Sequence, residues 1–277
     1  MEIGEFRMRA RLGCQTYTWE MLGNKWTRGI DDILNTISDL GFEGIEVSVN
    51  MIGAYCHSPM AFQDALSRRS LDLSAFALSS PYGFSDPKFR EFELKEVRAA
   101  LQFLTFFPGA ILSLGGATSN EQDRTNRLRY ACDFYNACAR LGYEMGIVVA
   151  VHPHSHQGSL IETEEEYENL MKWTDSDCLK WNPDTGHISR GGQDLVDCLG
   201  RYKSRIAHIH AKDADSQGKW RPLGKGECEL RGMLQVLKNI GYSSWIVIED
   251  ESPEAGQDPK RILGEDLRVM RGLVEMA

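Results

Sequence analysis

The stretch DDILNTISDLGFEGIEV, residues 31–47, contains a complete helix-to-strand pattern. Its first part has apolar residues at helical spacing and closes on Gly41, a glycine of the kind that follows helix C-termini. A short apolar run then begins at Ile45 and predicts a β-strand. The same order of helix, Leu-Gly or Ile-Gly and apolar strand recurs at residues 126–151 and 230–248. The repetition indicates a chain built from βα units.

Eight strands alternating with amphipathic helices are predicted along the chain. Helical patterns cover residues 31–41, 95–107, 126–142 and 230–241, and Gly142 and Gly241 close the last two as Gly41 closes the first. The predicted strands begin at Leu12, Ile45, Leu73, Ala110, Ile147, Leu179, Ile206 and Trp245. Eight such units predict an α/β fold, a (β/α)8 TIM barrel, as one domain over residues 1–277. A doubly wound sheet is the alternative, but no glycine-rich dinucleotide or phosphate motif follows the first strand.

Composition narrows the class of function. The chain has 31 Lys and Arg against 40 Asp and Glu, a net charge of −9, which argues against a nucleic-acid partner. It has no apolar run long enough to cross a membrane, and the N-terminus MEIGEFRMRARLG lacks the apolar region of a secretory signal. We therefore expect a cytoplasmic enzyme of small molecules. The seven cysteines form no Cys-x-x-Cys pair and are interpreted as thiols without a disulfide framework.

Histidines gather at the ends of the later strands. Six of the seven lie between His152 and His210, each at or just after an apolar run. The fifth strand ends in His152, His154 and His156, and His152 is the expected metal ligand because it lies nearest the strand. Imidazoles and carboxylates brought together at strand ends are typical of a divalent-metal site.

Three further strand ends supply the other candidates. Asp184 follows the sixth strand as a hard oxygen ligand, with a helix N-cap as the alternative. In the seventh strand His210 points inward, and Lys212 has the same parity. A buried lysine beside a metal would have a lowered pKa and could move protons, whereas the alternative is a surface lysine. Glu249 follows the buried run IVI of the eighth strand, where an ionised carboxylate needs a partner or a metal.

The first half of the chain offers weaker candidates for substrate contact. Gln15, Tyr17 and Trp19 follow the first strand, and Glu46 lies in the second. The aromatic rings would form a wall of a sugar-sized pocket, and packing in the core is the equal alternative.

Taken together, the motifs resemble the xylose-isomerase-like TIM-barrel superfamily over nearly the whole chain. They are LGCQTYTWE, LGFEGIEV, DTGH, RIAHIHAKD, the stretch Pro222–Gly226 and GYSSWIVIEDE. The resemblance implies one divalent ion held after strands five to eight, and three of the family's ligands match Asp184, His210 and Glu249. The family's substrate-contacting histidine matches His187. Epimerases of the family have a glutamate where this chain has His152, whereas inosose dehydratases also place histidines there.

The resulting hypothesis is a divalent-metal-dependent sugar isomerase or epimerase that acts on a keto-sugar or sugar derivative through a metal-stabilised enediolate. Glu249, Lys212 or His154 would serve as the base. The ion would be Mn²⁺ or Co²⁺, with Zn²⁺ or Mg²⁺ as alternatives. A dehydratase of a ketocyclitol or keto-sugar is the first alternative, since it shares the proton-removal step. A catalytically silent barrel acting as a binding subunit is the second, and a homo-oligomer is a family expectation.

Overall fold

The computed structural model describes residues 9–277, and residues 1–8, where most of the segment examined for a secretory signal lies, are outside that range. One sheet of eight strands runs through it in the order β6-β5-β4-β3-β2-β1-β10-β7, with every neighbouring pair parallel. The strands are β1 (Arg11–Gln15), β2 (Gly44–Ser48), β3 (Asp72–Leu78), β4 (Ile111–Gly115), β5 (Val149–His152), β6 (Leu179–Trp181), β7 (Ile209–Ala211) and β10 (Trp245–Ile248).

The two ends of this sheet meet. Parallel bridges join Trp181 to Ile206 and Asp184 to His210, so the segment after β6 lies beside the segment that contains β7. The amide N–H of His210 donates to the carbonyl of Pro183 at 2.8 Å across the same seam. The sheet therefore closes, and the predicted (β/α)8 barrel is confirmed.

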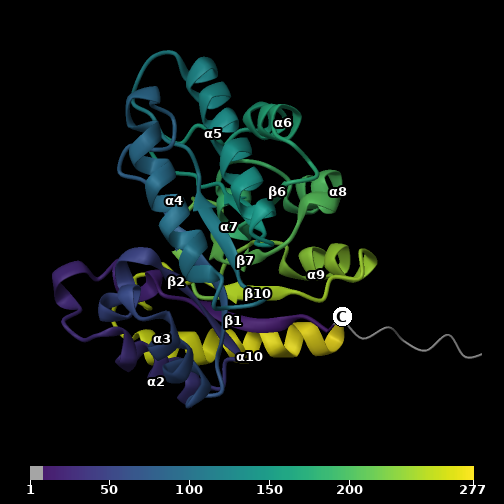
Figure 1. The fold of residues 1–277 in the computed structure, drawn as a ribbon. Coiled ribbons are helices and arrows are strands. Elements are labelled where there is room, and N and C mark those ends of the chain that lie inside the picture. Colours follow the sequence, from purple (N-terminus) through teal and green to yellow (C-terminus); the bar gives the residue numbers. More distant parts are fainter. Residues whose placement is uncertain (1–8) are drawn as a thin grey trace, which may run out of the picture.

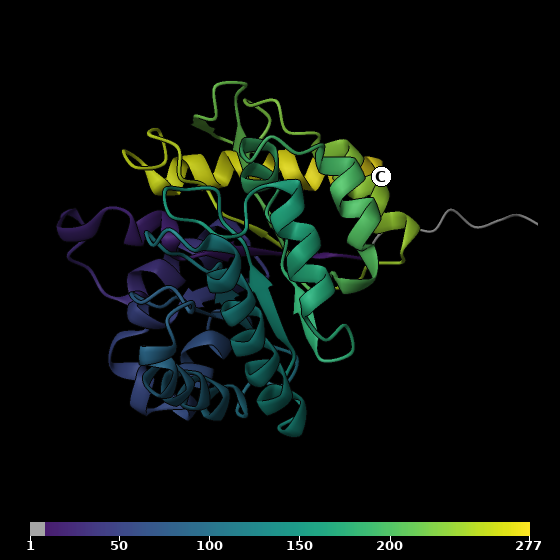
Figure 2. The same ribbon diagram turned by 90° about the horizontal axis from the view of Figure 1, so that it is seen from above.

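Helices lie on the outer side of the sheet in both views (Figures 1 and 2). The C-terminal helix α10 packs against α2 and α9, which closes the helical ring as the bridges close the sheet. The longer helices are α2 (Ile30–Leu40), α3 (Pro59–Ser67), α4 (Arg90–Leu104), α5 (Arg124–Glu144), α6 (Glu164–Trp173), α8 (Leu195–Tyr202), α9 (Leu230–Asn239) and α10 (Pro259–Met276). The short elements are α1 (Tyr17–Glu20), α7 (Thr185–Arg190), the hairpin strands β8 (Asp213–Ala214) and β9 (Trp220–Arg221), and 3₁₀ turns at Gly23–Lys25, Val49–Met51, Gly53–His57, Pro87–Phe89 and Lys203–Arg205.

Two of the three predicted helix-closing glycines have that role. Gly41 and Gly241 follow α2 and α9 with φ of +86° and +66°, a left-handed conformation that glycine adopts without strain. Gly142 does not close its helix, because α5 continues to Glu144. A side chain there would lie 2.5 Å from Cγ2 of Val149, so the glycine instead allows α5 to approach β5 closely.

The inside of the barrel is unusually polar. The inner apolar cluster is only Ala75, Ile111 and Ala150, separate from the main core between sheet and helices. The space towards the carboxyl ends of the strands is filled instead by buried polar side chains: Glu46, Ser113, Asn182, His208 and His210. TIM-barrel interiors are more commonly packed with branched apolar residues, so this polar filling marks the end of the barrel where function is expected.

Two expectations from composition are met within the described residues. All seven cysteines are free, and four of them are buried. No helix there is both long and apolar enough to cross a membrane.

A buried carboxyl pair beside the barrel gives a prediction about stability. Asp266 of α10 is fully buried, and its Oδ1 accepts a hydrogen bond from the amide of Leu223 at 2.8 Å. Burial, followed by the neighbouring Asp250 carboxyl, raises the pKa of Asp266 to about 9. The folded chain thus holds a proton that the unfolded chain releases near pH 4, so stability falls as pH rises between these values.

Asp266→Asn imitates the protonated form and should remove this dependence. Between pH 6 and pH 9 we expect the wild-type free energy of unfolding to fall by about 4 kcal/mol more than that of the variant. Urea denaturation with EDTA at several pH values measures the difference. Parallel curves for the two proteins would contradict the prediction.

Candidate metal centre and active site

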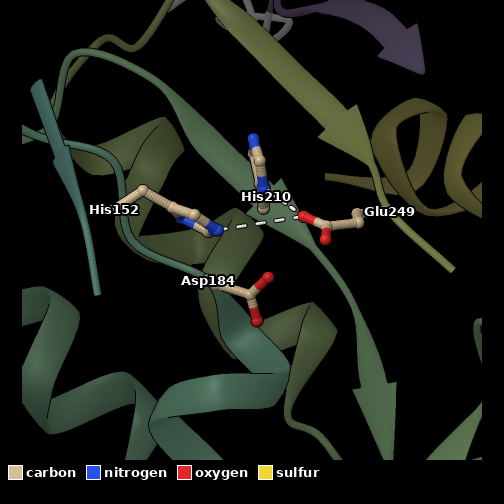
Figure 3. Close-up of side chains that lie close together, drawn as sticks. All are labelled: His152, Asp184, His210 and Glu249. Atoms are coloured by element: carbon tan, nitrogen blue, oxygen red, sulfur yellow. Dashed lines mark hydrogen bonds and ion pairs between the residues drawn. The ribbon is translucent and has the colours of Figure 1, made fainter. Parts of the chain in front are cut away.

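Four side chains from four strand ends converge at the mouth of the barrel. His152 ends β5, Asp184 is the N-cap of α7, His210 lies in β7 and Glu249 follows β10. One ligand atom of each lies within 4.8 Å of all the others, and all four residues are buried. Figure 3 shows them pointing towards one another. Nδ1 of His210 is 2.6 Å from Oε2 of Glu249, and Nε2 of His152 is 3.8 Å from the same oxygen. These are the four residues that the sequence predicted as metal ligands, and the structure brings them together.

Two unused atoms indicate that the set suits a cation. Nε2 of His152 and Oδ2 of Asp184 are buried and have no hydrogen-bond partner. Nδ1 of His152 lies 3.2 Å from the carbonyl of Asn182, so it carries the proton and Nε2 presents its lone pair. Oδ1 of Asp184 accepts from the amide of His187 at 2.7 Å, whereas Oδ2 accepts no hydrogen bond and lies 3.5 Å from Nζ of Lys212. Asp184 is therefore an N-cap and also a candidate ligand, and two nitrogens with two oxygens fit a Mn²⁺, Co²⁺ or Zn²⁺ ion.

The pKa shifts of the side chains at this centre also favour the binding of a cation. Burial lowers the pKa of His152 to about 3, so its imidazole is neutral and can bind a metal. Burial also acts to lower the pKa of His210, but Glu46 and Glu249 on its two sides raise it to about 10. Burial opposes ionisation of Glu249 as well, yet Lys212 and His210 hold its pKa well below the ordinary value. The carboxylates around His210 thus stabilise a positive charge at the centre of the set.

Lys212 lies beside the four candidate ligands, and its pKa is shifted in the direction opposite to the one expected. Its Nζ is 3.0 Å from Oε1 of Glu249, 2.5 Å from Oε1 of Glu251 and 3.5 Å from Oδ2 of Asp184. Burial by itself lowers the pKa of Lys212, but the three carboxylates outweigh burial and raise this pKa to well above the ordinary lysine value. The expectation of a lowered pKa was wrong because it did not include three acidic neighbours. Lys212 is a buried ammonium group, able to give a proton and not to take one.

His187 and Lys212 form a pair of donors. Nδ1 of His187 accepts from the amide of Ser155 at 2.9 Å, so in the neutral imidazole the proton is on Nε2. Burial, and then Lys212, keep the pKa of His187 well below its usual range. Nζ of Lys212 lies 3.3 Å from that Nε2, and since both groups donate, a substrate oxygen is the partner that would satisfy them together.

The other histidines of the fifth strand line the same cavity. His154 is next to His152 and His187, with ring centroids 4.5 and 5.0 Å apart. Burial and then His152 lower its pKa well below the ordinary value, which leaves a neutral ring. His156 is farther out and exposed, at the rim.

A cavity of about 760 Å³ extends from His152 and Glu249 towards the ends of β1 to β4. Gln15 and Tyr17 line it, as expected for substrate contacts. Trp19 and Glu46 do not belong to the lining. Trp19 is 2% exposed and packs against Trp26, so its core alternative was the right one. Glu46 is fully buried and bonds to His208 and His210, so the substrate contact predicted for it is corrected.

Sequence reasoning missed the β8–β9 hairpin, which carries a wall of the cavity. The indole of Trp220 lies 4.9 Å from the ring of His187, and Nζ of Lys212 is 5.0 Å from its centroid. Gly186 is required here, since a Cβ would lie 2.8 Å from Cγ of Lys212. Behind the hairpin, the carboxylate of Asp213 accepts from the amides of Ala214, Gly224, Gly226 and Cys228. These bonds explain why the stretch Pro222–Gly226 contains two glycines, because the amides of Gly224 and Gly226 both bond to Asp213.

Comparison with known proteins agrees with the resemblance seen in the motifs. A family model described as xylose isomerase-like TIM barrel matches residues 34–273. Inosose dehydratase of Geobacillus kaustophilus is 25% identical over an alignment of 286 residues that covers 90% of both chains. The crystal structure of the IolI protein with a bound zinc atom has a TM-score of 0.80 at 16% identity, covering 95% of this chain and 98% of that chain. The 3-keto-D-glucoside 4-epimerase YcjR of E. coli has a TM-score of 0.77 at 15% identity, covering 95% and 99%.

Proposed function

Because the chain belongs to the xylose isomerase-like TIM barrel family, we propose that it is a divalent-metal-dependent dehydratase that removes water from a ketocyclitol or keto-sugar. The contact between Glu249 and Lys212 carries this proposal, since it puts an ionised carboxylate 3.0 Å from a buried ammonium group. Elimination of water uses a base for the C–H proton and an acid for the departing hydroxyl, and this contact supplies one of each. The similarity to inosose dehydratases supports the same reaction class.

His152, Asp184, His210 and Glu249 would hold the ion. Bound there, it would act as a Lewis acid on the substrate carbonyl and make the neighbouring C–H bond more acidic. His187 and Lys212 present two donors, 3.3 Å apart, to the oxygens of the substrate. Gln15 and Tyr17 line the opposite part of the cavity and would orient the ring.

In the reaction, Glu249 accepts the proton from the carbon next to the carbonyl. The C–O bond of the β-hydroxyl breaks as the electron pair forms the new C=C bond. Lys212 gives its proton to the departing oxygen, which leaves as water. The 3.0 Å contact between Oε1 of Glu249 and Nζ of Lys212 then lets the proton return, so both groups recover their initial charges. Since the two groups touch, both act from one face of the substrate, and the elimination is syn.

An isomerase or epimerase, which the sequence narrowly favoured, is the second candidate. His154 supports it, because a neutral imidazole lining the cavity could carry a proton to a second position on the substrate. Against it, the only carboxylates of the ligand set are Asp184 and Glu249, and Asp184 is engaged as the cap of α7. A paired acid and base made of two ligating glutamates is therefore not present in this set.

Mass spectrometry of a ketocyclitol and keto-sugar panel, incubated with Mn²⁺-loaded enzyme in D₂O, distinguishes the candidates. We expect a product that has lost one water. A product of unchanged formula that has gained deuterium would replace the dehydratase by an isomerase or epimerase. A chain that turns over no substrate and shows no thermal shift with Mn²⁺ or Co²⁺ would be a silent barrel, since bound metal stabilises the folded state.

A further inference from the structure

The Glu46 carboxylate links strands from opposite parts of the chain inside the barrel. Its Oε2 lies 2.8 Å from Nε2 of His208 and 2.8 Å from Nε2 of His210, and all three side chains are 0% exposed. Its Oε1 accepts from Nε2 of Gln15 at 3.2 Å. A glutamate buried this deeply needs such partners, because an unpaired charge there is costly. Through His210, the carboxylate is in contact with the candidate metal centre.

The two ring nitrogens of His210 have different surroundings. Nδ1 faces the ligand set and lies 2.6 Å from Glu249, while Nε2 faces Glu46. The side-chain nitrogen of Asn182 also lies 3.3 Å from Nε2, but this nitrogen is a donor and cannot accept a proton from the ring. The side-chain oxygen of Asn182 has no hydrogen-bond partner. Glu46 is thus the group that accepts a hydrogen bond from Nε2–H, so in the neutral ring that would bind a metal the lone pair is on Nδ1. A carboxylate behind a metal-binding histidine fixes the ring and makes it a better ligand.

We propose that Glu46 is a positioning residue for the metal centre, which fixes the orientation and tautomer of His210 so that Nδ1 is the ligand atom. His208 holds Glu46 from the other side and keeps Oε2 directed at His210. This inference rests on the proposed metal site but not on which reaction occurs there. It assigns Glu46 to the support of His210, in place of the substrate contact expected from sequence.

A different assignment of the same residues is that Glu46, His208 and His210 themselves hold an ion, since their ligand atoms also lie within 4.8 Å of one another. The hydrogen-bond distances of 2.8 Å favour the supporting role, because each imidazole then already has its partner. The number of ions per chain separates the two assignments.

The test is the affinity of Glu46→Gln for Zn²⁺ and Co²⁺, measured by competition with a chelator. Glutamine has the same shape but no charge, so we expect about 10- to 100-fold weaker binding of a single ion. The absorption spectrum of bound Co²⁺ should also change, which a general loss of stability would not cause. Glu93→Gln is the matched control for affinity, since Glu93 is 2% exposed and bonds to Ser80 and to the amide of Phe84, not to a histidine.

Unchanged affinity and spectrum in Glu46→Gln would overturn the inference while leaving the metal site intact. Two ions per wild-type chain, reduced to one in His208→Ala, would overturn it in favour of a second site. A wild-type chain that binds no ion would remove the metal site and this inference together. Should Glu46→Gln fail to fold, ¹⁵N NMR of the zinc-loaded wild type still decides, since a proton on Nε2 of His210 is required and one on Nδ1 contradicts the proposal.

Discussion

Lys212→Met is expected to lower kcat for elimination by about 10²–10⁴-fold, the usual contribution of a positioned acid. The departing oxygen would have to leave without the proton that Lys212 supplies. Metal should be retained, because removing a positive charge does not weaken the binding of a neighbouring cation. The measurement is kcat with the substrate that the mass-spectrometric panel identifies, together with the metal content of the variant.

A partial reaction separates the acid from the base. Glu249 is intact in Lys212→Met, so the variant should still exchange the proton next to the carbonyl, and substrate recovered from D₂O should gain deuterium. Lys212→Arg is the matched control, since arginine keeps the charge but does not release a proton. A rate restored by arginine would show that Lys212 acts as a fixed charge, and the proposed proton transfer would be wrong.

Much of the ligand set follows from strand parity. Residues two apart in a strand point to the same side, and parallel strands deliver their last residues to one edge of the barrel. This reasoning places His210 and Lys212 together and predicts Glu249 after β10. It works because these positions depend on local sequence and on a fold whose repeat is visible in the chain.

Parity does not reveal which side chains meet across the barrel. Glu46 was expected at the pocket, but β2 presents it to His208, 162 residues away in sequence. The charge of Lys212 was misjudged for the same reason, since its pKa depends on carboxylates contributed by other strands. Local pattern gives the direction of a side chain, whereas its electrostatic neighbours are set by tertiary contacts.

Irregular segments and close backbone contacts were also not predicted from the sequence. The β8–β9 hairpin has only two residues in each strand, too few for a periodic signal, yet it brings Trp220 to His187. The available clue was the pair of glycines at 224 and 226, whose amides bond to Asp213. Gly142 was misread because a glycine at a helix end and one at a close helix–strand contact look alike in sequence.

Asp184→Asn should weaken metal binding by more than about 100-fold, beyond the 10- to 100-fold typical of residues that only support a ligand. The change replaces Oδ2, which accepts no hydrogen bond, by an amide nitrogen, which cannot coordinate. Oδ1 remains to accept from the amide of His187, so α7 keeps its cap. Wild-type protein at a metal concentration of 100 Kd should gain about 2.7 kcal/mol of stability, and the variant at that concentration should gain almost none.

Asp194→Asn is the matched control, because Asp194 caps α8 in the same way, through the amide of Asp197, but is exposed and outside the ligand set. Its metal affinity should equal that of the wild type. If Asp184→Asn also binds metal normally, Asp184 is a helix cap and nothing more. Because Asp184 supplies one of only two carboxylates in the ligand set, that result would leave the cation with Glu249 and two imidazoles, and the charge argument for a divalent ion at this mouth would fail.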